Sequence, residues 1–213
     1  MSRDKKQAVQ AAPSRAPLLN LAQDGRYIGK LAGILLAITA ITALLLGVVN
    51  YITAPVIAAA TAEKRLAAMQ QVLVAEEYPA VASLPVEGES YDSAAGTGTV
   101  TGLYRAMQSG QQIGYVAEVT VNGFGGAIDL VVGLSMERTV TGVAVISHSE
   151  TPNVGSKVVG DQAVLSRFTG LTGEITVGGD ENGVDAVSGA TTTSKAVTAG
   201  VNAAIAAITD VLV

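Results

Sequence analysis

The stretch DAVSGATTTSK, residues 185–195, holds the side chains of this chain that are best suited to bind an anion. Five hydroxyl side chains fall within the seven residues from Ser188 to Ser194, and an alanine-rich apolar run follows them. A Gly-Ala-Thr turn that leads into a helix presents unpaired backbone N–H groups and the positive end of the helix dipole. The stretch therefore predicts either a phosphate-binding helix start or an N-terminal cap. A cap uses one hydroxyl, so the cluster exceeds what capping needs.

A second polar stretch, ISHSETPNVGSK at residues 146–157, follows a β-like run and contains His148, Glu150, Thr151 and Lys157. Loops that sit on a rigid sheet often carry binding groups. His148 is the only histidine of the chain, and cysteine is absent, which argues against a zinc site. An exposed or hydrogen-bonded loop histidine is the plainer interpretation, and Gly155 is interpreted as an ordinary turn glycine.

A third stretch, NGFGGAIDL at residues 122–130, is rich in glycine. Glycine lets a backbone approach a planar ligand closely, but the same residues are typical of a hairpin turn with a bulge. We favour the hairpin.

Composition excludes several classes of protein. The net charge of −5 argues against nucleic acid as a partner, because the phosphates would be repelled. Without cysteine there are no disulfides and no thiolate metal sites. Hydroxyl groups alone are poor metal ligands, so we predict no metal site.

A membrane segment is predicted near the N-terminus. The run from Leu31 to Ile52 has no charged residue and is long enough to cross a hydrocarbon core of about 30 Å. A buried core helix and a cleaved signal peptide are the alternatives; the run is too apolar for the first and too long for the second. Residues 1–30 carry six basic and two acidic side chains, so we expect a cytoplasmic arm at 1–30, a transmembrane helix at 31–54 and an extracytoplasmic remainder.

The pattern of consecutive strands flanked by helices after residue 54 predicts an α+β domain. We expect a helical linker and an irregular segment at 55–97, with Ile57, Leu66, Met69 and Leu73 near one helix face, and then a folded domain at 98–213. Its elements are four β-like runs joined as antiparallel hairpins, a short helix, a brief strand and a final helix; these lie at 99–107, 112–121, 127–135, 139–147, 161–168, 174–177 and 192–212.

The residues D185-A-V-S-G-A-T191 resemble the flavinylation signature of the FMN-binding domain family, and SHSETPNVGSK is similar to the His-x-Glu-Thr-Pro-Gly-x-Gly loop of that family. Asn153 replaces the usual glycine, and asparagine also tolerates a positive φ. Together with the N-terminal apolar helix and the length of the chain, these motifs resemble the G subunit of the Rnf-type electron-transport complexes.

The resemblance implies a covalently bound FMN, esterified through its phosphate to Thr191 by a flavin transferase. It implies an electron carrier without independent catalysis, in a membrane complex that couples electron flow between ferredoxin and NAD to movement of Na⁺ or H⁺. Glu150 and Thr151 would contact the ring. The further residues implied at the cofactor are Asp185, Ser188, Gly189, Ala190, Thr192, Ser194, His148 and Lys157. The alternatives are the C subunit of the Na⁺-translocating NADH:quinone reductase and a tethered binding module without a redox role.

Overall fold

The computed structural model describes residues 25–81, 88–178 and 182–211. The chain divides into two compact units, Met1–Val56 and Ile57–Val213, and each is described by itself. Most of the predicted arm at 1–30 lies outside the described residues.

Helix α1, Gly25–Val72, includes one stretch that is long and apolar enough to cross a membrane. Its threonine hydroxyls donate to main-chain carbonyls one turn back, with Thr42 Oγ1 2.8 Å from Ile38 O and Thr53 Oγ1 2.8 Å from Val49 O. Such internal bonds remove the need for water at these hydroxyls. We expected the apolar helix and the linker helix to be separate elements, but α1 continues through Pro55. Proline removes one backbone hydrogen bond of the helix, and α1 continues as one element on both sides of it.

One antiparallel sheet of five strands follows, in the order β1-β2-β3-β4-β5. It confirms the four predicted hairpin strands and adds the short strand β1 in the segment that we expected to be irregular; the bounds are β1 Ser90–Ser93, β2 Gly96–Gln108, β3 Gln111–Asn122, β4 Ala127–Ser135 and β5 Val140–His148. Positive φ angles at Ser109 and Gly110 form the tight turn between β2 and β3, and a positive φ at Arg138 lies in the turn between β4 and β5.

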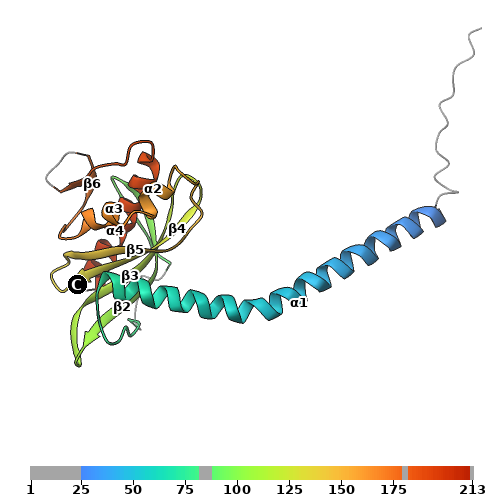
Figure 1. Ribbon diagram of the computed structural model, residues 1–213, viewed down its shortest axis with the longest axis horizontal. Coiled ribbons are helices and arrows are strands. Elements are labelled where there is room, and N and C mark those ends of the chain that lie inside the picture. The colour runs from blue at the N-terminus through green and yellow to red at the C-terminus, as the bar shows by residue number, and fades with distance from the viewer. Residues whose placement is uncertain (1–24, 82–87, 179–181, 212–213) are drawn as a thin grey trace, which may run out of the picture. The chain divides into compact units, whose positions relative to one another are not determined.

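Helix α4, Thr191–Val211, covers one face of the sheet and contacts β1, β2, β3 and β4. The helical spacing of Val197, Val201, Ala204, Ile208 and Val211 predicts one apolar face; the first four are fully buried and Val211 is partly buried. Figure 1 shows α4 on the same side of the sheet as the short helices α2, Ser156–Val159, and α3, Gln162–Leu165, and all three contribute to one apolar core. This face positions the helix start that carries the hydroxyl cluster.

The last turns of α1 cover the opposite face of the sheet, where Met69 and Val72 are buried. Thr141 Oγ1 donates to Val72 O at 2.7 Å, which fixes the end of the helix on β5. Of the four residues that we expected near one helix face, Met69 is buried and Leu73 partly buried against the sheet, whereas Ile57 and Leu66 are exposed. The helix reaches the sheet only in its last turns, so sequence spacing could not show where contact begins.

The remaining elements are short. The helix expected at 161–168 is split into α3 and the 3₁₀ turn η1, Ser166–Phe168, and the strand expected at 174–177 is reduced to β6, Thr176–Val177. Strand β6 pairs in parallel with β7, Gly183–Val184. Asn202, on α4, holds this region through two hydrogen bonds of 2.8 Å with the main chain of Ile175.

Candidate functional site

The start of α4 is a tight turn whose geometry depends on Gly189 and Ser194. Gly189 has φ +76°, a conformation that favours glycine. The Ser194 hydroxyl accepts from Val187 N and donates to Ala190 O, each at 3.1 Å. Ser194 therefore ties the preceding turn to the helix, and its hydroxyl serves the fold.

The hydroxyls of this cluster divide by exposure. Ser188, Thr191 and Thr192 are exposed, whereas Thr193 is fully buried. The buried Thr193 Oγ1 has no hydrogen-bond partner among the described residues. The backbone N–H groups in the first turn of a helix have no intrahelical partner, so the exposed hydroxyls lie beside unpaired donors. A hydroxyl ester carrying a negative charge fits this helix start.

The Glu150 carboxylate lies 26 residues along the chain from the hairpin loop that it holds. One oxygen, Oε1, accepts from Phe124 N at 2.8 Å, and the other, Oε2, accepts from Gly125 N at 3.1 Å. The side chain is only 7% exposed. A β-carbon at Gly123 would overlap this carboxylate. The glycines of the β3–β4 loop therefore let its backbone close over Glu150.

Gly155 joins the two predicted motifs. A β-carbon at this position would overlap the Glu150 carboxylate and would lie 2.7 Å from Thr193 Oγ1. The hairpin loop, the loop after β5 and the start of α4 thus meet around one buried carboxylate. We interpreted Gly155 as a turn glycine, but the positive φ of this loop, +62°, belongs to Asn153, and Gly155 has φ −67°. Space, and not backbone torsion, requires glycine at 155.

Four other predicted residues of the two motifs are exposed. The Nδ1 atom of His148 accepts from Glu150 N at 3.3 Å, and the His148 side chain is exposed. Thr151, Lys157 and Asp185 are exposed. The carbonyl of Asp185 accepts from Arg167 Nη1 at 3.4 Å. Within the described residues, no hydrogen bond joins the Lys157 or Asp185 side chain to the Thr191 hydroxyl.

The structure adds Phe124, which sequence reasoning did not assign to the site. The glycine-rich stretch at residues 122–130 forms a hairpin turn, as we favoured. Its glycines also let the backbone of this turn lie close to the loop after β5. Phe124 lies on that loop with its ring 62% exposed. A large exposed aromatic among glycines was the available signal, although spacing alone could not show which loop it faces.

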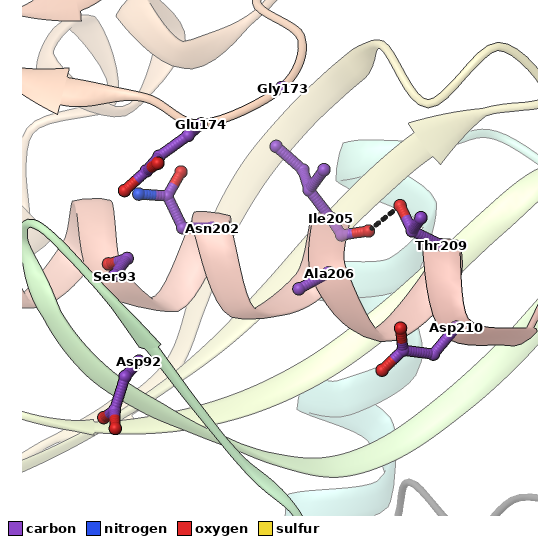
Figure 2. Close-up of a pocket in the computed structure, with 9 residues that line it drawn as sticks. All are labelled: Asp92, Ser93, Gly173, Glu174, Asn202, Ile205, Ala206, Thr209 and Asp210. Atoms are coloured by element: carbon purple, nitrogen blue, oxygen red, sulfur yellow. Dashed lines mark hydrogen bonds between the residues drawn. The ribbon is translucent and has the colours of Figure 1, made fainter.

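A cavity of about 340 Å³ lies elsewhere, between β1, the segment at Gly173–Glu174 and the C-terminal half of α4. Figure 2 shows Glu174 and Asn202 directed toward one another, with Asp92 and Asp210 at the other sides of the cavity. Glu174 Oε1 accepts from Ala94 N at 3.1 Å. Across the described ranges, no group of three or more His, Asp or Glu side chains could hold a metal ion. None of the residues that line this cavity belongs to the predicted motifs.

Burial, together with the charge and the hydrogen bond of Asp210, raises the pKa of Tyr91, beside this cavity, to about 12. Tyr91 lies on β1 and Asp210 in the last turn of α4, so this pair joins the edge strand to the end of the helix.

Two family models match the chain. The FMN-binding domain matches residues 123–206, a range that contains the hairpin loop, the loop after β5 and the start of α4. The RnfG N-terminal region matches residues 24–72, which correspond to α1.

Curated relatives match over most of the chain. The G subunit of the Na⁺-translocating ferredoxin:NAD⁺ oxidoreductase complex of Acetobacterium woodii is 31% identical over 85% of this chain and 92% of its own length. The G subunit of the ion-translocating oxidoreductase complex of Yersinia pestis is 34% identical, over 81% and 87% of the two chains. The crystal structure of Shewanella oneidensis NqrC is 24% identical with a TM-score of 0.44, over 58% of this chain and 64% of that one.

Proposed function

The chain belongs to the family of G subunits of the ion-translocating oxidoreductase complexes, and we propose that it carries electrons on an FMN bound covalently through Thr191. The observation that carries the proposal is the helix start itself. An exposed threonine hydroxyl, that of Thr191, lies in the first turn of a 21-residue helix. Two residues further on, the buried Thr193 Oγ1 has no hydrogen-bond partner among the described residues.

These residues fit a phosphoryl group. Esterification of Thr191 would leave one negative charge on the phosphate, next to the unpaired N–H groups of the first turn. Ser188 and Thr192 are exposed on either side and would donate hydrogen bonds to the phosphate oxygens, while Gly189 and Ala190 shape the turn. Thr193 is buried, and its orphaned hydroxyl would gain an acceptor if a phosphate oxygen reached it.

The loop after β5 would form the wall of the ring site. Thr151, His148 and Lys157 are exposed there and are available to a ligand. Both oxygens of Glu150 already bind the hairpin loop, so we assign it to the site's framework in place of direct ring contact. Asp185 belongs to the flavinylation signature, and we propose that it is recognised by the flavin transferase, since its side chain is exposed.

The bound flavin supplies reversible electron transfer, and the protein supplies attachment, orientation and local charge. No proton transfer by a side chain is required, so we expect no independent catalysis by this protein alone. Its partners are the other subunits of the complex, which couples electron flow between ferredoxin and NAD to the movement of Na⁺ or H⁺. The flavin transferase is a further, transient partner.

We propose that α1 anchors the protein in the cell membrane as a single span, with the N-terminus in the cytoplasm and the FMN domain outside it. The uncharged run after Lys30 and the basic residues before it support this orientation. A covalent link suits a domain outside the cytoplasm, because a dissociated cofactor would be lost by dilution.

The two alternatives receive less support. The C subunit of the NADH:quinone reductase is a rival because it shares both motifs, but residues 24–72 match the RnfG N-terminal region and the curated relatives described above are G subunits. A non-redox binding module would not require the match of residues 123–206 to an FMN-binding domain.

Replacement of the acceptor tests the proposal. We expect Thr191→Ala to abolish covalent flavin after co-expression with a flavin transferase, while Thr192→Ala keeps it and Thr191→Ser retains part of it. The fold should survive, because loss of a cap costs about 1–2 kcal/mol. The assay is in-gel fluorescence under ultraviolet light after denaturation, with intact mass on the same samples.

The matched pair also locates the acceptor. A fluorescent band from folded Thr191→Ala protein would refute the assignment. Flavin lost in Thr192→Ala but retained in Thr191→Ala would move the attachment by one residue, since both hydroxyls are exposed.

A further inference from the structure

We propose that Glu150 is a positioning residue: its buried carboxylate locks the β3–β4 hairpin loop, Gly123–Gly126, onto the loop after β5 and thereby holds Phe124 at the flavin site. The part of this inference that concerns flavin rests on the function proposed above. The lock itself concerns only the residues of this chain.

The hydrogen bonds define the lock. Adjacent backbone N–H groups of one loop, those of Phe124 and Gly125, each donate to a separate oxygen of the same carboxylate, at 2.8 and 3.1 Å. Hydrogen bonds to an ionised acceptor are roughly twice as strong as neutral ones. Two more backbone bonds, each of 2.9 Å, support this arrangement: Ser149 N donates to Ala127 O and aligns the two segments, and Gly123 N donates to Gly126 O within the hairpin loop.

Packing around the carboxylate depends on glycine at neighbouring positions. Glycine at 123 and at 155 flanks the carboxylate, and a β-carbon at either place would overlap it. A β-carbon at Gly125 would lie 2.6 Å from Thr151 N, which is closer than real contacts of this kind. Two glycines, Gly123 and Gly155, therefore make room for the carboxylate, and a third, Gly125, lets the backbones of the two loops approach each other.

The chemistry at Glu150 requires a carboxylate in particular. Both of its ligands are N–H donors, so both side-chain oxygens must accept. Glutamine has the same shape but replaces one oxygen by an NH₂ group, which would face an N–H donor. Glu150→Gln therefore breaks one of the two bonds without changing the volume of the side chain.

The consequence reaches the flavin site through Phe124. The lock fixes the backbone of Phe124, whose ring is 62% exposed. Gly155 lies against both this carboxylate and the buried Thr193, which is two residues from the proposed attachment point. An aromatic ring fixed in this way forms a rigid wall for a planar cofactor tethered at Thr191, and a loose loop would not.

Hydrogen exchange of the full chain, produced without a flavin transferase, tests the lock alone. We expect the amides of Phe124 and Gly125 to exchange about tenfold faster or more in Glu150→Gln, as expected when a bond to a charged acceptor is lost. Glu150→Asp keeps the charge and should restore part of the protection. The matched control is Glu174→Gln, because Glu174 also accepts a backbone N–H, that of Ala94, but lies at the other cavity.

The flavin-loaded chain tests the positioning role through the fluorescence anisotropy and the visible circular dichroism of the attached flavin. Both should change in Glu150→Gln, return partly in Glu150→Asp and stay unchanged in Glu174→Gln. Phe124→Leu should reproduce the change while leaving the two amides protected.

The outcomes separate the claims. Unchanged exchange at Phe124 and Gly125 in Glu150→Gln overturns the lock, and faster exchange with unchanged flavin spectra overturns the positioning role. If amides throughout the sheet exchange faster in Glu150→Gln, that variant has unfolded. The exchange of the Phe124 and Gly125 amides in Glu150→Asp then tests the lock. A wild-type chain that takes up no flavin contradicts the proposed function, whereas the exchange result still decides the lock.

Discussion

Gly155 packs directly against the carboxylate of Glu150, so that a β-carbon at position 155 would occupy the space of the carboxylate oxygens. The same glycine lies beside Thr193 Oγ1. This contact joins the two sequence motifs, and the structure shows that their adjacency depends on a residue without a side chain.

Gly155→Ala should destabilise the protein by about 1–3 kcal/mol, because the new methyl group overpacks a site with no space for it. Gly189→Ala is the matched control, since it has open space around it but φ +76°, and should cost about 1–2 kcal/mol from backbone torsion alone. Chemical denaturation of both full-length variants in detergent measures the two costs. The hydrogen-exchange protection of the Phe124 and Gly125 amides should fall only in Gly155→Ala; equal protection in the two variants would contradict the steric explanation.

Val201→Asp should destabilise the FMN-binding domain by roughly 3–5 kcal/mol, because Val201 is fully buried between α4 and the sheet and an aspartate there has no partner. Lys195→Asp introduces the same side chain at an exposed position of the same helix and should change stability little. Thermal unfolding followed by circular dichroism compares the two. A melting temperature of Val201→Asp equal to that of the wild type would show that this face is not part of the core.

Tyr91 should ionise near pH 12, later than an ordinary tyrosine, because burial and Asp210 both disfavour the phenolate. A raised pKa in the folded state means that the neutral phenol stabilises the fold fully below pH 10, and that this contribution is lost as the pH rises through about 12. The difference between ultraviolet titrations of the wild type and Tyr91→Phe isolates this group. Asp210→Asn should lower the midpoint; a wild-type midpoint near 10 would refute the shift.

The C-terminus should lie outside the cytoplasm, because the basic residues that precede the uncharged run stay on the cytoplasmic side. Fusion of reporters to Val213 tests this orientation. A reporter active only in the periplasm or outside the cell should work, and one active only in the cytoplasm should fail. Replacement of Lys5, Lys6 and Arg15 by glutamine should reduce the bias, whereas an active cytoplasmic reporter on the unchanged chain would reverse the proposed topology.

The sequence by itself determined the order and type of the main elements. The uncharged run from Leu31 to Ile52, the four β-like runs and the helical spacing of Val197, Val201, Ala204, Ile208 and Val211 are local patterns, and local patterns report local structure. The two motifs also indicated the family, because residue order within a motif is fully visible in a sequence. Asn153 was expected to tolerate a positive φ, and its φ is +62°.

Only the tertiary structure decided how these parts meet. Glu150 bonds to the loop at Phe124 and Gly125, and its packing excludes a β-carbon at Gly123 and Gly155; none of these contacts follows a period in the sequence. The exposure of Ile57 and Leu66 depends on where α1 reaches the sheet, which its own pattern does not contain. Contacts between segments far apart in the chain depend on how the sheet brings the loops together, and for that reason the framework of the site could be described only from the folded chain.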